Sequence, residues 1–523
     1  MAQIVNTKPD NGPESQRPLI AWLSSPAAHG LDARKAVERV ETHASVVFLA
    51  GQRAWKLKRA VRYDYFDYST PARRRHYLLE ELRLNRRTAP SIYRAVRAVR
   101  QTPDGAYRID SGTGRAVDYL LEMRQFDPAT QFDRLAERGA LDLALMAPLA
   151  DAMARLHETA TPRRDHGGAG AMRRVIEGNR DGLAAYGAGA LDGAACTRLA
   201  ESSLTLLDRL GARLDARRAD GFVRHCHGDL HLRNICLVDG ETTIFDCIEF
   251  DDAFSCIDTW YDGAFLVMDL LDRGLGAHAN AVLNRYLDRT GDIDGITLLP
   301  LFLSVRAAVR AKICATAATL QTDSANAAGL RDAARSYLEL ALSVMEPGAP
   351  RVLAIGGISG SGKTTLARRL APGVGPAPGA VVLRSDIERK RLFGVPPERP
   401  LGPEGYTTEA NQRVYATLLD RARAIIDAGH GVIVDAVWPD PKTSGAIEAV
   451  ARDAGVPFTG LWLDAPLETL ARRLAGRRRD ASEATADVAA RQAQRVARPA
   501  SWVRLDASGG VDAVAAAARS ALR

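Results

Sequence analysis

Short apolar runs alternate with helical stretches along the last third of the chain. The runs are RVLAIGG, AVVLRSD, GVIVDAV, FTGLWLD and SWVRLD, and they lie between residues 351 and 506. Continuous apolar strands separated by helices are typical of a parallel sheet that helices cover on both faces. The pattern therefore predicts an α/β domain over residues 351–523.

The first two thirds of the chain have a different order, in which strands come first and helices dominate afterwards. VVFLAG and AWKLKRAV flank Gly51-Gln52 and predict a hairpin, which the helical pattern RRRHYLLEELRLNRR follows. A last helical pattern over residues 326–345 ends at the Pro- and Gly-containing segment Glu346–Pro350. We expect a flexible N-terminus over residues 1–25, an α+β domain over 26–345, a linker over 346–350 and the α/β domain over 351–523.

Length and composition agree with a protein of several globular domains. The chain has 523 residues, of which 46% are hydrophobic and 25% are charged, close to the values of ordinary soluble proteins. The N-terminus is polar, and the most apolar stretch, Ile296–Val309, is short and contains Arg306, so we expect neither a signal peptide nor a membrane span. Six cysteines without a CxxC pair argue against a disulfide framework. We therefore expect a cytoplasmic protein.

The net charge of +7 is concentrated in the predicted α/β domain. Residues 351–523 contain 25 Lys and Arg against 18 Asp and Glu, whereas residues 1–350 contain 45 of each kind. Such a surplus suits a domain that binds phosphates. A solvated basic face is the alternative interpretation.

The segment GGISGSGKTT carries the phosphate-binding pattern GxxxxGK[ST] between an apolar strand and the helical TTLARRL. Its glycines let backbone N–H groups surround the phosphates of ATP, Lys363 neutralises charge, and the Thr364 hydroxyl reaches Mg²⁺. We therefore predict an ATP and Mg²⁺ site. The predicted nucleotide-binding residues of this loop are Gly357, Ser359, Gly360, Ser361, Gly362, Lys363, Thr364 and Thr365.

Two carboxylates beside apolar runs extend the predicted site. Asp386 follows the second run and would accept the proton of a substrate hydroxyl, or else cap a helix that starts at Ile387. Asp435 ends the third run, where a carboxylate of P-loop enzymes holds the water shell of Mg²⁺. The basic pair Arg389-Lys390 suits an anionic substrate, with a solvated pair as the alternative.

An arginine-rich segment follows LWLDAP and reads LETLARRLAGRRRDASEA. We predict that Arg473 and Arg477 belong to a lid that closes over the transferred phosphoryl group and stabilises its charge. Together with GGISGSGKTT, SDIERKRLFG and VIVDA, this segment resembles the small-molecule kinases related to gluconate kinase and zeta toxin, over about residues 351–510. The resemblance implies phosphorylation of a hydroxyl, with Asp386 as the base and Arg389 beside it. Glu483 stands where the lid of these kinases leads us to expect an aspartate.

HGDLHLRN, at residues 227–234, forms a second catalytic pattern, and ICLVDGETTIFDCIEF follows it. The spacing matches a kinase-like catalytic loop and the metal-binding aspartate beyond it. Asp229 would orient or deprotonate the substrate hydroxyl, Asn234 and Asp246 would bind Mg²⁺, and His227 would support the loop. A polar turn is the alternative. Zinc is a weaker one, because the spacing of its candidate ligands fits no common zinc site: His225, Cys226, His227, His231 and Cys236.

A kinase-like site also needs a lysine on an N-terminal strand. AWKLK offers Lys56 and Lys58, which strand alternation places on the same face. Glu80 or Glu81 in the following helix would pair with either lysine. Of the two, Lys56 fits the expected A-x-K spacing slightly better.

The HGDxHxxN loop and the strand lysine resemble the aminoglycoside phosphotransferase family, part of the larger protein-kinase-like group, over about residues 30–340. The resemblance implies a protein-kinase-like fold and an adenine-binding hinge near Leu121, Glu122 and Met123. VFLAGQRAW contains a single glycine where the group has a Gly-rich loop. That departure leaves the activity of this module open.

The whole chain resembles a bacterial group described as bifunctional aminoglycoside phosphotransferase and ATP-binding protein. Our main hypothesis is a kinase with two modules, each of which transfers the γ-phosphate of ATP to a hydroxyl of a small molecule. One alternative is an N-terminal pseudokinase that senses a ligand and regulates the P-loop domain. Another is a polynucleotide 5′-hydroxyl kinase, but we do not expect nucleic acid as a partner because the basic domain has no aromatic-rich basic stretch.

Overall fold

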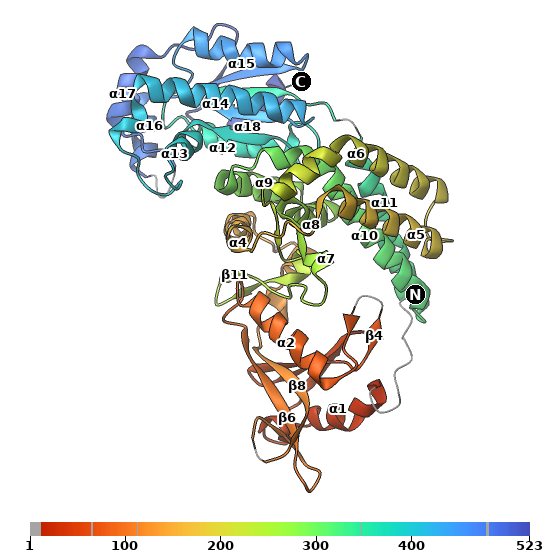
Figure 1. The fold of residues 1–523 in the computed structure, drawn as a ribbon. Helices are drawn as coiled ribbons and strands as arrows, with labels where there is room; N and C mark the ends of the chain where they lie inside the picture. The colour runs from red at the N-terminus through yellow and green to blue at the C-terminus, as the bar shows by residue number, and fades with distance from the viewer. Residues whose placement is uncertain (1–11, 64–65, 112, 347, 477–480, 523) are drawn as a thin grey trace. The chain divides into compact units, whose positions relative to one another are not determined.

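The computed structural model describes residues 12–63, 66–111, 113–346, 348–476 and 481–522 (Figure 1). The chain forms two compact units, Met1–Leu266 with Lys312–Ala334 and Val267–Ala311 with Arg335–Arg523. This division does not coincide with the linker expected at residues 346–350, and the domain boundaries drawn from the sequence stay a prediction. Among the residues that the model describes, no helix is long and apolar enough to cross a membrane.

The first unit contains a six-stranded antiparallel sheet with the order β1-β2-β3-β8-β6-β7. The predicted hairpin is confirmed as β2 and β3, in which Ser45 pairs with Lys58 and Ala50 with Arg53. The two-residue turn between them uses a positive φ of 65° at Gly51. The predicted helix that follows is α2, which the Thr70 side chain caps. These elements are β1 (Glu38–Glu41), β2 (Ser45–Ala50), β3 (Arg53–Lys58), β6 (Tyr93–Gln101), β7 (Tyr107–Ile109), β8 (Arg115–Arg124), α1 (Arg17–Leu23) and α2 (Pro71–Asn85), with the short pair β4 (Arg62–Tyr63) and β5 (Phe66–Asp67) between β3 and α2.

Helices and two small strand pairs make up the rest of this unit. The strand β9 precedes the HGDLHLRN loop in the chain, the hairpin of β10 and β11 follows it directly, and β12, which pairs with β9, comes later. The elements are α3 (Phe132–Glu137), α4 (Met146–Thr159), α5 (Gly168–Tyr186), α6 (Gly193–Ala219), β9 (Val223–His225), β10 (Ile235–Val238), β11 (Glu241–Ile244), α7 (Asp252–Ser255) and β12 (Cys256–Asp258). The helices α8 (Thr259–Asp272), α10 (Leu299–Leu320) and α11 (Ser324–Ser343) each run across a boundary between the two units.

The second unit contains the predicted parallel sheet, with the strand order β14-β15-β13-β16-β17. The helices α12 and α18 pack on one face, where Ile355, Ile433 and Leu463 meet Leu366 and Ala515. The helices α14 and α15 contact strands of the same sheet and lie on its other side (Figure 1). Both faces are thus covered, which explains why β13, β14 and β15 are buried at every position.

The elements of this unit confirm the five predicted strands. They are β13 (Val352–Gly356), α12 (Lys363–Leu370), β14 (Val381–Arg384), α13 (Ser385–Leu392), α14 (Thr408–Asp427), β15 (Val432–Asp435), α15 (Pro441–Asp453), β16 (Phe458–Asp464), α16 (Leu467–Ala475), α17 (Ala486–Arg495), β17 (Val503–Asp506) and α18 (Val511–Ala521). The helix α9 (Gly276–Thr290) and the 3₁₀ turn Asp294–Leu298 also belong to this unit. The central strand β13 lies between β15 and β16, so the glycine-rich loop leaves the sheet where the strand order changes direction, which is the usual place for a ligand.

Candidate active sites

The HGDLHLRN loop of the first unit holds Asp229 and Asn234 in direct contact. The Asn234 side-chain amide donates to the backbone oxygen of Asp229 at 2.9 Å and to its Oδ2 atom at 3.0 Å. His231 Nε2 lies 3.3 Å from the same carboxylate, which keeps 38% of its side-chain surface exposed. The contact orients the Asp229 carboxylate, and the amide oxygen of Asn234 remains as a possible metal ligand.

His227 ties this loop to the strand that leads to Asp246. Its Nε2 atom lies 2.8 Å from the Phe245 oxygen, and its Nδ1 atom accepts from the backbone N–H of Asp229 at 3.3 Å. Burial lowers the pKa of His227, so the ring is neutral at pH 7, with the proton on Nε2. This histidine therefore supports the loop.

Asp262, on α8, anchors the start of the loop and was not among the predicted residues. Its Oδ1 atom accepts from Gly228 N at 2.8 Å, and its Oδ2 atom accepts from His227 N at 3.0 Å. His157 Nε2 lies 3.0 Å from the same Oδ2, and the Asp262 side chain is fully buried. A buried carboxylate requires such partners, so a lone aspartate in the apolar segment WYDGAFLVM is the signal that could have identified it.

The five cysteines and histidines weighed as zinc ligands do not gather in one place. Among the described residues, the groups with metal-ligating geometry are His157–Cys226–Asp262 and His225–Asp252–Cys256. Asp262 already binds two backbone N–H groups in the first. Arg163 donates to Asp252 and contacts Cys256 Sγ in the second, and its charge disfavours a cation there.

Lys56 and Lys58 both reach Glu81 of α2, so the pairing expected for either lysine holds for both. Lys56 Nζ lies 2.7 Å from Glu81 Oε1 and 3.0 Å from Asp246 Oδ1. Lys58 Nζ lies 2.8 Å from Glu81 Oε2 and 2.5 Å from Glu249 Oε1. Lys56 is thus the lysine that joins α2 to Asp246, whereas Lys58 is buried between two carboxylates. The other candidate on α2, Glu80, pairs with Arg83 instead.

The charges of this cluster compensate one another. Burial alone would raise the pKa of Glu81, but the ammonium groups of Lys56 and Lys58 lower it to about 2. Burial alone would lower the pKa of Lys56, but Asp246, Glu81 and Glu249 raise it well above its usual value. Lys56 therefore stays charged and Glu81 stays ionised at neutral pH. Asp246 adopts a positive φ of 63°, and its backbone N–H donates to the Tyr93 hydroxyl.

Glu122 and Met123 lie within the sheet. They occupy β8, where Trp55 and Ala54 of β3 pair with them on one side. The Glu122 side chain is 6% exposed and accepts from Arg97 Nε at 2.8 Å. The chain leaves the strand only after Arg124, and the assignment of an adenine hinge at 121–123 stays a prediction.

The glycine-rich loop of the second unit curls between β13 and α12. Gly357, Gly360 and Gly362 adopt positive φ values of 135°, 87° and 96°. A Cβ atom on Gly357 would lie 2.6 Å from the Leu463 oxygen, so only glycine fits there. Lys363 Nζ donates to the backbone oxygens of Gly357 at 2.9 Å and Ile358 at 3.2 Å. The Lys363 side chain therefore reaches from the end of the loop back to its first residues.

Thr364 and Asp435 meet beside this loop. The Thr364 hydroxyl donates to Asp435 Oδ2 at 2.5 Å, and Arg384 Nε lies 3.9 Å from the same oxygen. Burial raises the pKa of Asp435, while Lys363, Arg384 and the Thr364 hydrogen bond lower it. The two predicted metal residues are thus side by side, with two cations close to the carboxylate.

Asp386 lies in the first turn of α13, two residues beyond the end of β14. The alternative that Asp386 caps a helix starting at Ile387 is wrong, because the helix begins at Ser385 with Arg384 as its N-cap. The solvated alternative for Arg389-Lys390 is also wrong, since these residues are 7% and 2% exposed. Arg389 donates to the Gly405 oxygen, and Lys390 pairs with Glu483 at 2.8 Å.

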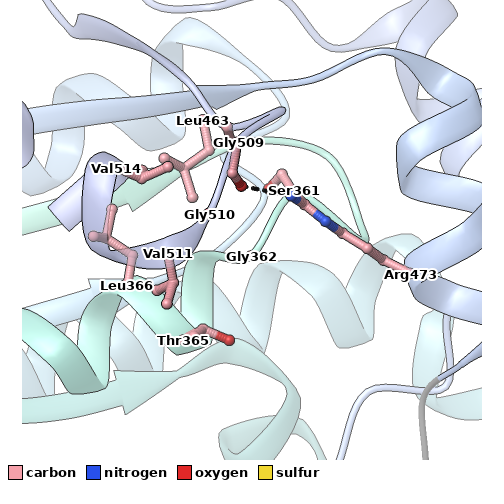
Figure 2. A pocket seen from close by; sticks show the side chains of 11 residues that line it. Ser361, Gly362, Thr365, Leu366, Leu463, Arg473, Gly509, Gly510, Val511 and Val514 are labelled. Carbon is pink, nitrogen blue, oxygen red and sulfur yellow. Dashed lines mark hydrogen bonds between the residues drawn. The ribbon is translucent and has the colours of Figure 1, made fainter.

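A pocket of 340 Å³ opens beside the glycine-rich loop (Figure 2). Arg473 lies at its edge and donates to the Gly509 oxygen at 3.2 Å, as the dashed line in Figure 2 shows. The other predicted lid arginine, Arg477, lies outside the described residues. The pocket is lined by Ser361, Gly362, Thr365, Leu366, Leu463, Arg473, Ala507, Gly509, Gly510, Val511 and Val514.

Glu483 of the arginine-rich segment and Gln492 beyond it contact two different parts of this site. Gln492 of α17 accepts from the backbone N–H of Ser359 at 2.8 Å. Glu483 accepts from Leu401 N at 2.9 Å in addition to pairing with Lys390. Gln492 therefore contacts the glycine-rich loop, and Glu483 contacts α13 and the segment that follows it.

Two family models and several known proteins match parts or nearly all of this chain. Residues 50–298 match the model of the phosphotransferase enzyme family, and residues 352–499 match an AAA-domain model. The uncharacterized protein Rv2004c of Mycobacterium tuberculosis is 30% identical over 490 residues, which cover 92% of this chain and 94% of the relative. The adenylyl-sulfate kinase of Myxococcus xanthus is 31% identical over 122 residues, 23% of this chain and 62% of that protein.

Solved structures resemble parts of the chain. A choline/ethanolamine kinase family protein from Mesorhizobium loti is 14% identical, with a TM-score of 0.39, and covers 63% of this chain and 95% of its own. The APS kinase CysC of Mycobacterium tuberculosis is 26% identical, with a TM-score of 0.26, and covers 33% of this chain and 98% of its own. The near full-length match to Rv2004c and the two family models show that the chain belongs to the family of that mycobacterial protein, and that it is a kinase-type phosphotransferase made of a phosphotransferase-family module and a P-loop module.

Proposed function

We propose that both modules use Mg·ATP and transfer its γ-phosphate to a hydroxyl group of a small molecule. The observation that carries the proposal is the position of Lys56, whose ammonium group lies within 3.0 Å of both Glu81 and Asp246. This is the lysine, helix glutamate and metal-binding aspartate arrangement that holds ATP phosphates in kinases. The P-loop of the second unit supplies an equivalent phosphate site on an unrelated fold.

In the first unit, Asp229 is the proposed acceptor of the hydroxyl proton. Its carboxylate is partly exposed and held by Asn234 and His231, so a bound hydroxyl could reach it. The oxygen atoms of Asn234 and Asp246 suit Mg²⁺, a cation that prefers oxygen ligands. Bound Mg²⁺ would neutralise charge on the ATP phosphates, and Lys56 would orient them.

In the second unit, Lys363 and the loop N–H groups are proposed to bind the phosphates. Thr364 and Asp435 offer two oxygens in contact at the place where P-loop enzymes hold Mg²⁺. Asp386, at the start of α13, is the proposed base. Arg389 is buried beside it and lies 5.0 Å from the Tyr406 ring centroid, where it would face an anionic group on the acceptor.

The 340 Å³ pocket beside the loop is the proposed site of the adenine ring. Its lining combines apolar side chains with Gly509 and Gly510, whose lack of side chains leaves backbone groups accessible to a base edge. The guanidinium of Arg473 can stack on a flat aromatic ring. This role would place Arg473 at the base of ATP and leave the transferred phosphoryl group to other residues.

Separable inactivation of the two modules tests the proposal. Purified protein is screened with Mg·ATP against sugars, amino alcohols and nucleosides, with acceptor-stimulated ADP release as the signal. We expect Lys363→Ala to remove the activity toward one group of acceptors and Asp229→Ala the activity toward another. If neither substitution changes nucleotide binding or phosphoryl transfer, the proposal is wrong.

Two further outcomes distinguish the alternatives. In the first alternative, ATP raises the thermal stability of the wild-type protein but not that of Lys56→Met, and no phosphoryl transfer depends on Asp229. That result would favour a ligand-sensing pseudokinase. An affinity for RNA or DNA that falls steeply as salt rises from low to physiological levels would favour a polynucleotide kinase.

A further inference from the structure

A helix of the phosphotransferase-family module is part of the second unit, and it pairs with the edge of the P-loop sheet. The family match over residues 50–298 includes α9, Gly276–Thr290. The compact unit that contains α9 also contains the P-loop and α13. Contacts between α9 and the P-loop sheet therefore lie inside one compact unit.

Asn284 of α9 completes the hydrogen bonding of β14, the edge strand of the sheet. Val381 N–H points inward and donates to the Gly431 oxygen at 2.9 Å. Val382 N–H points outward and donates to Asn284 Oδ1 at 2.7 Å, while Asn284 Nδ2 donates to the Ala380 oxygen at 3.1 Å. The asparagine side chain thus offers β14 a donor and an acceptor as a neighbouring strand would, and it satisfies backbone groups that would be costly to bury without partners.

Asn280, one turn earlier on α9, extends this pairing. Its Nδ2 atom donates to the Pro378 oxygen at 3.0 Å and to the Ala380 oxygen at 3.1 Å. Its Oδ1 atom accepts from Asn284 Nδ2 at 3.0 Å. Asn280 is 3% exposed, so this amide ladder is sealed from water, where hydrogen bonds are hard to replace.

The C-terminal half of α9 also holds α13 and the loop beyond it. Arg391 of α13 donates to the backbone oxygens of Leu287 and Asp288, at 2.9 and 3.0 Å. Arg285 and Arg289 reach Glu398, in the loop after α13, at 3.1 and 2.9 Å. The helix α9 therefore contacts the segment from Val382 to Glu398 at three places: in β14 before α13, in α13 itself, and in the loop after it.

The charge of Arg384 acts both on Asp288 of α9 and on Asp435, the carboxylate proposed to support Mg²⁺. Burial raises the pKa of Asp288, and Arg384 is the foremost of the cations that lower it. Arg384 Nε also lies 3.9 Å from Asp435 Oδ2. The charge of Asp288 therefore acts on the arginine that stands next to the Thr364–Asp435 pair.

We propose that α9 is a working part of the P-loop active site, in which Asn284 is a positioning residue that sets β14 and α13, and through them Asp386, against the phosphate-binding loop. The inference rests on the proposed phosphotransfer at this loop. It implies that the P-loop module depends on the phosphotransferase-family module for its geometry, so a change in α9 alters transfer at the P-loop without touching ATP.

The test uses the full-length protein with Asp229→Asn, so that only the P-loop module turns over Mg·ATP. In that background, Asn284→Ala is compared with Asn326→Ala, a matched substitution at an exposed position of α11. We expect Asn284→Ala to accelerate hydrogen exchange in residues 381–398 by about tenfold or more and to leave residues 352–370 protected. ATP turnover should fall about tenfold or more, because small misplacements of a reacting group cost up to ~100-fold. The KM for ATP should change less than about threefold.

The isosteric variant Asn284→Asp serves if Asn284→Ala does not fold. It keeps the acceptor for Val382 N–H and loses both donors, so exchange in residues 381–398 should again rise. Unchanged exchange there in both variants would overturn the inference, as would accelerated exchange with unchanged turnover. A failure of the proposed function is seen separately, because Lys363→Ala would then leave ATP binding and turnover intact whatever α9 does.

Discussion

The Thr364 hydroxyl donates to Asp435 Oδ2 across 2.5 Å, so the start of α12 and the end of β15 bring two side-chain oxygen atoms together. The two residues lie 71 positions apart in the chain, and the parallel pairing of β13 with β15 brings them to one edge of the sheet. The pair is therefore assembled by the fold before any ligand arrives. The contribution that we propose for Thr364 and Asp435 in Mg²⁺ binding can therefore be tested by substitution.

Substitution of Asp435 should change the magnesium dependence of the P-loop module. Asp435→Asn keeps the size of the side chain and a hydrogen bond to Thr364, but it removes the negative charge. We expect ATP turnover in the Asp229→Asn background to fall by ~10–100-fold, the usual effect of altering groups that support a metal. Titration of turnover with Mg²⁺ should show a higher half-saturating concentration. Asp427→Asn, at an exposed position near the end of α14, is the control, and an identical titration for both variants would contradict the assignment.

The two strand lysines should have different consequences when they are removed. Lys58→Met leaves Glu249 and one oxygen of Glu81 buried without a cation, and breaking a buried pair in this way costs about 3–5 kcal/mol of unfolding free energy. Lys56→Met leaves Glu81 bound to Lys58, so it should lower Asp229-dependent transfer more than stability. Thermal unfolding and transfer assays on both variants check this. Equal losses of stability in the two would show that the lysines do not divide their roles.

The sequence was sufficient where the chemistry lies in one continuous segment. GGISGSGKTT and HGDLHLRN each carry their functional groups at fixed spacing, so both loops and the strands beside them could be predicted. The choice between Lys56 and Lys58 was not settled by spacing, because both lie on one face of β3 and the difference arises from Asp246 and Glu249, almost 200 residues later. Local periodicity contains no information about such contacts.

Two other relationships were beyond the sequence for the same reason. Asp262 is a buried polar residue in the largely apolar helix α8, and its role depends on the backbone N–H groups of His227 and Gly228. Asn284 is one polar residue of an amphipathic helix, and its partner Val382 lies 98 residues away. In both cases the sequence shows only a polar residue among the hydrophobic positions of a helix. Its partner, and therefore its function, required the fold.

Asp262 should be essential for the order of the HGDLHLRN loop. Asp262→Asn retains one acceptor oxygen, so it leaves one buried backbone N–H of the loop without a partner, which costs about 1–3 kcal/mol. We expect faster hydrogen exchange at residues 227–229 and a loss of Asp229-dependent transfer, with the activity that depends on Lys363 unchanged. His157→Gln, which alters the other neighbour of Asp262, should have a smaller effect on exchange. If exchange at residues 227–229 is the same as in the wild type, Asp262 does not position the loop.

Arg473 should affect the affinity for ATP more than the rate of transfer. A stacking contact between a guanidinium group and a base is worth about 1–2 kcal/mol when it is partly desolvated, so Arg473→Ala should raise the KM for ATP by ~5–30-fold. The kcat of the P-loop module should change little. A lid arginine that stabilised the transferred phosphoryl group would instead lower kcat by ~10³-fold or more. Steady-state kinetics with varied ATP in the Asp229→Asn background therefore separates the two roles.

His430, buried two residues before β15, should make the second unit less stable in acid. Its ring is 1% exposed, and burial lowers the pKa of His430 to about 4, below the ~6.5 of an unfolded chain. Between these values the unfolded state binds more protons, so stability falls as pH drops from ~6.5 and levels off below ~4. The full difference corresponds to about 3 kcal/mol. Hydrogen exchange of β15 amides, corrected for the intrinsic rate at each pH, should show this loss in the wild type and a shallower pH dependence in His430→Leu. Parallel pH profiles for the two proteins would exclude His430 as the source.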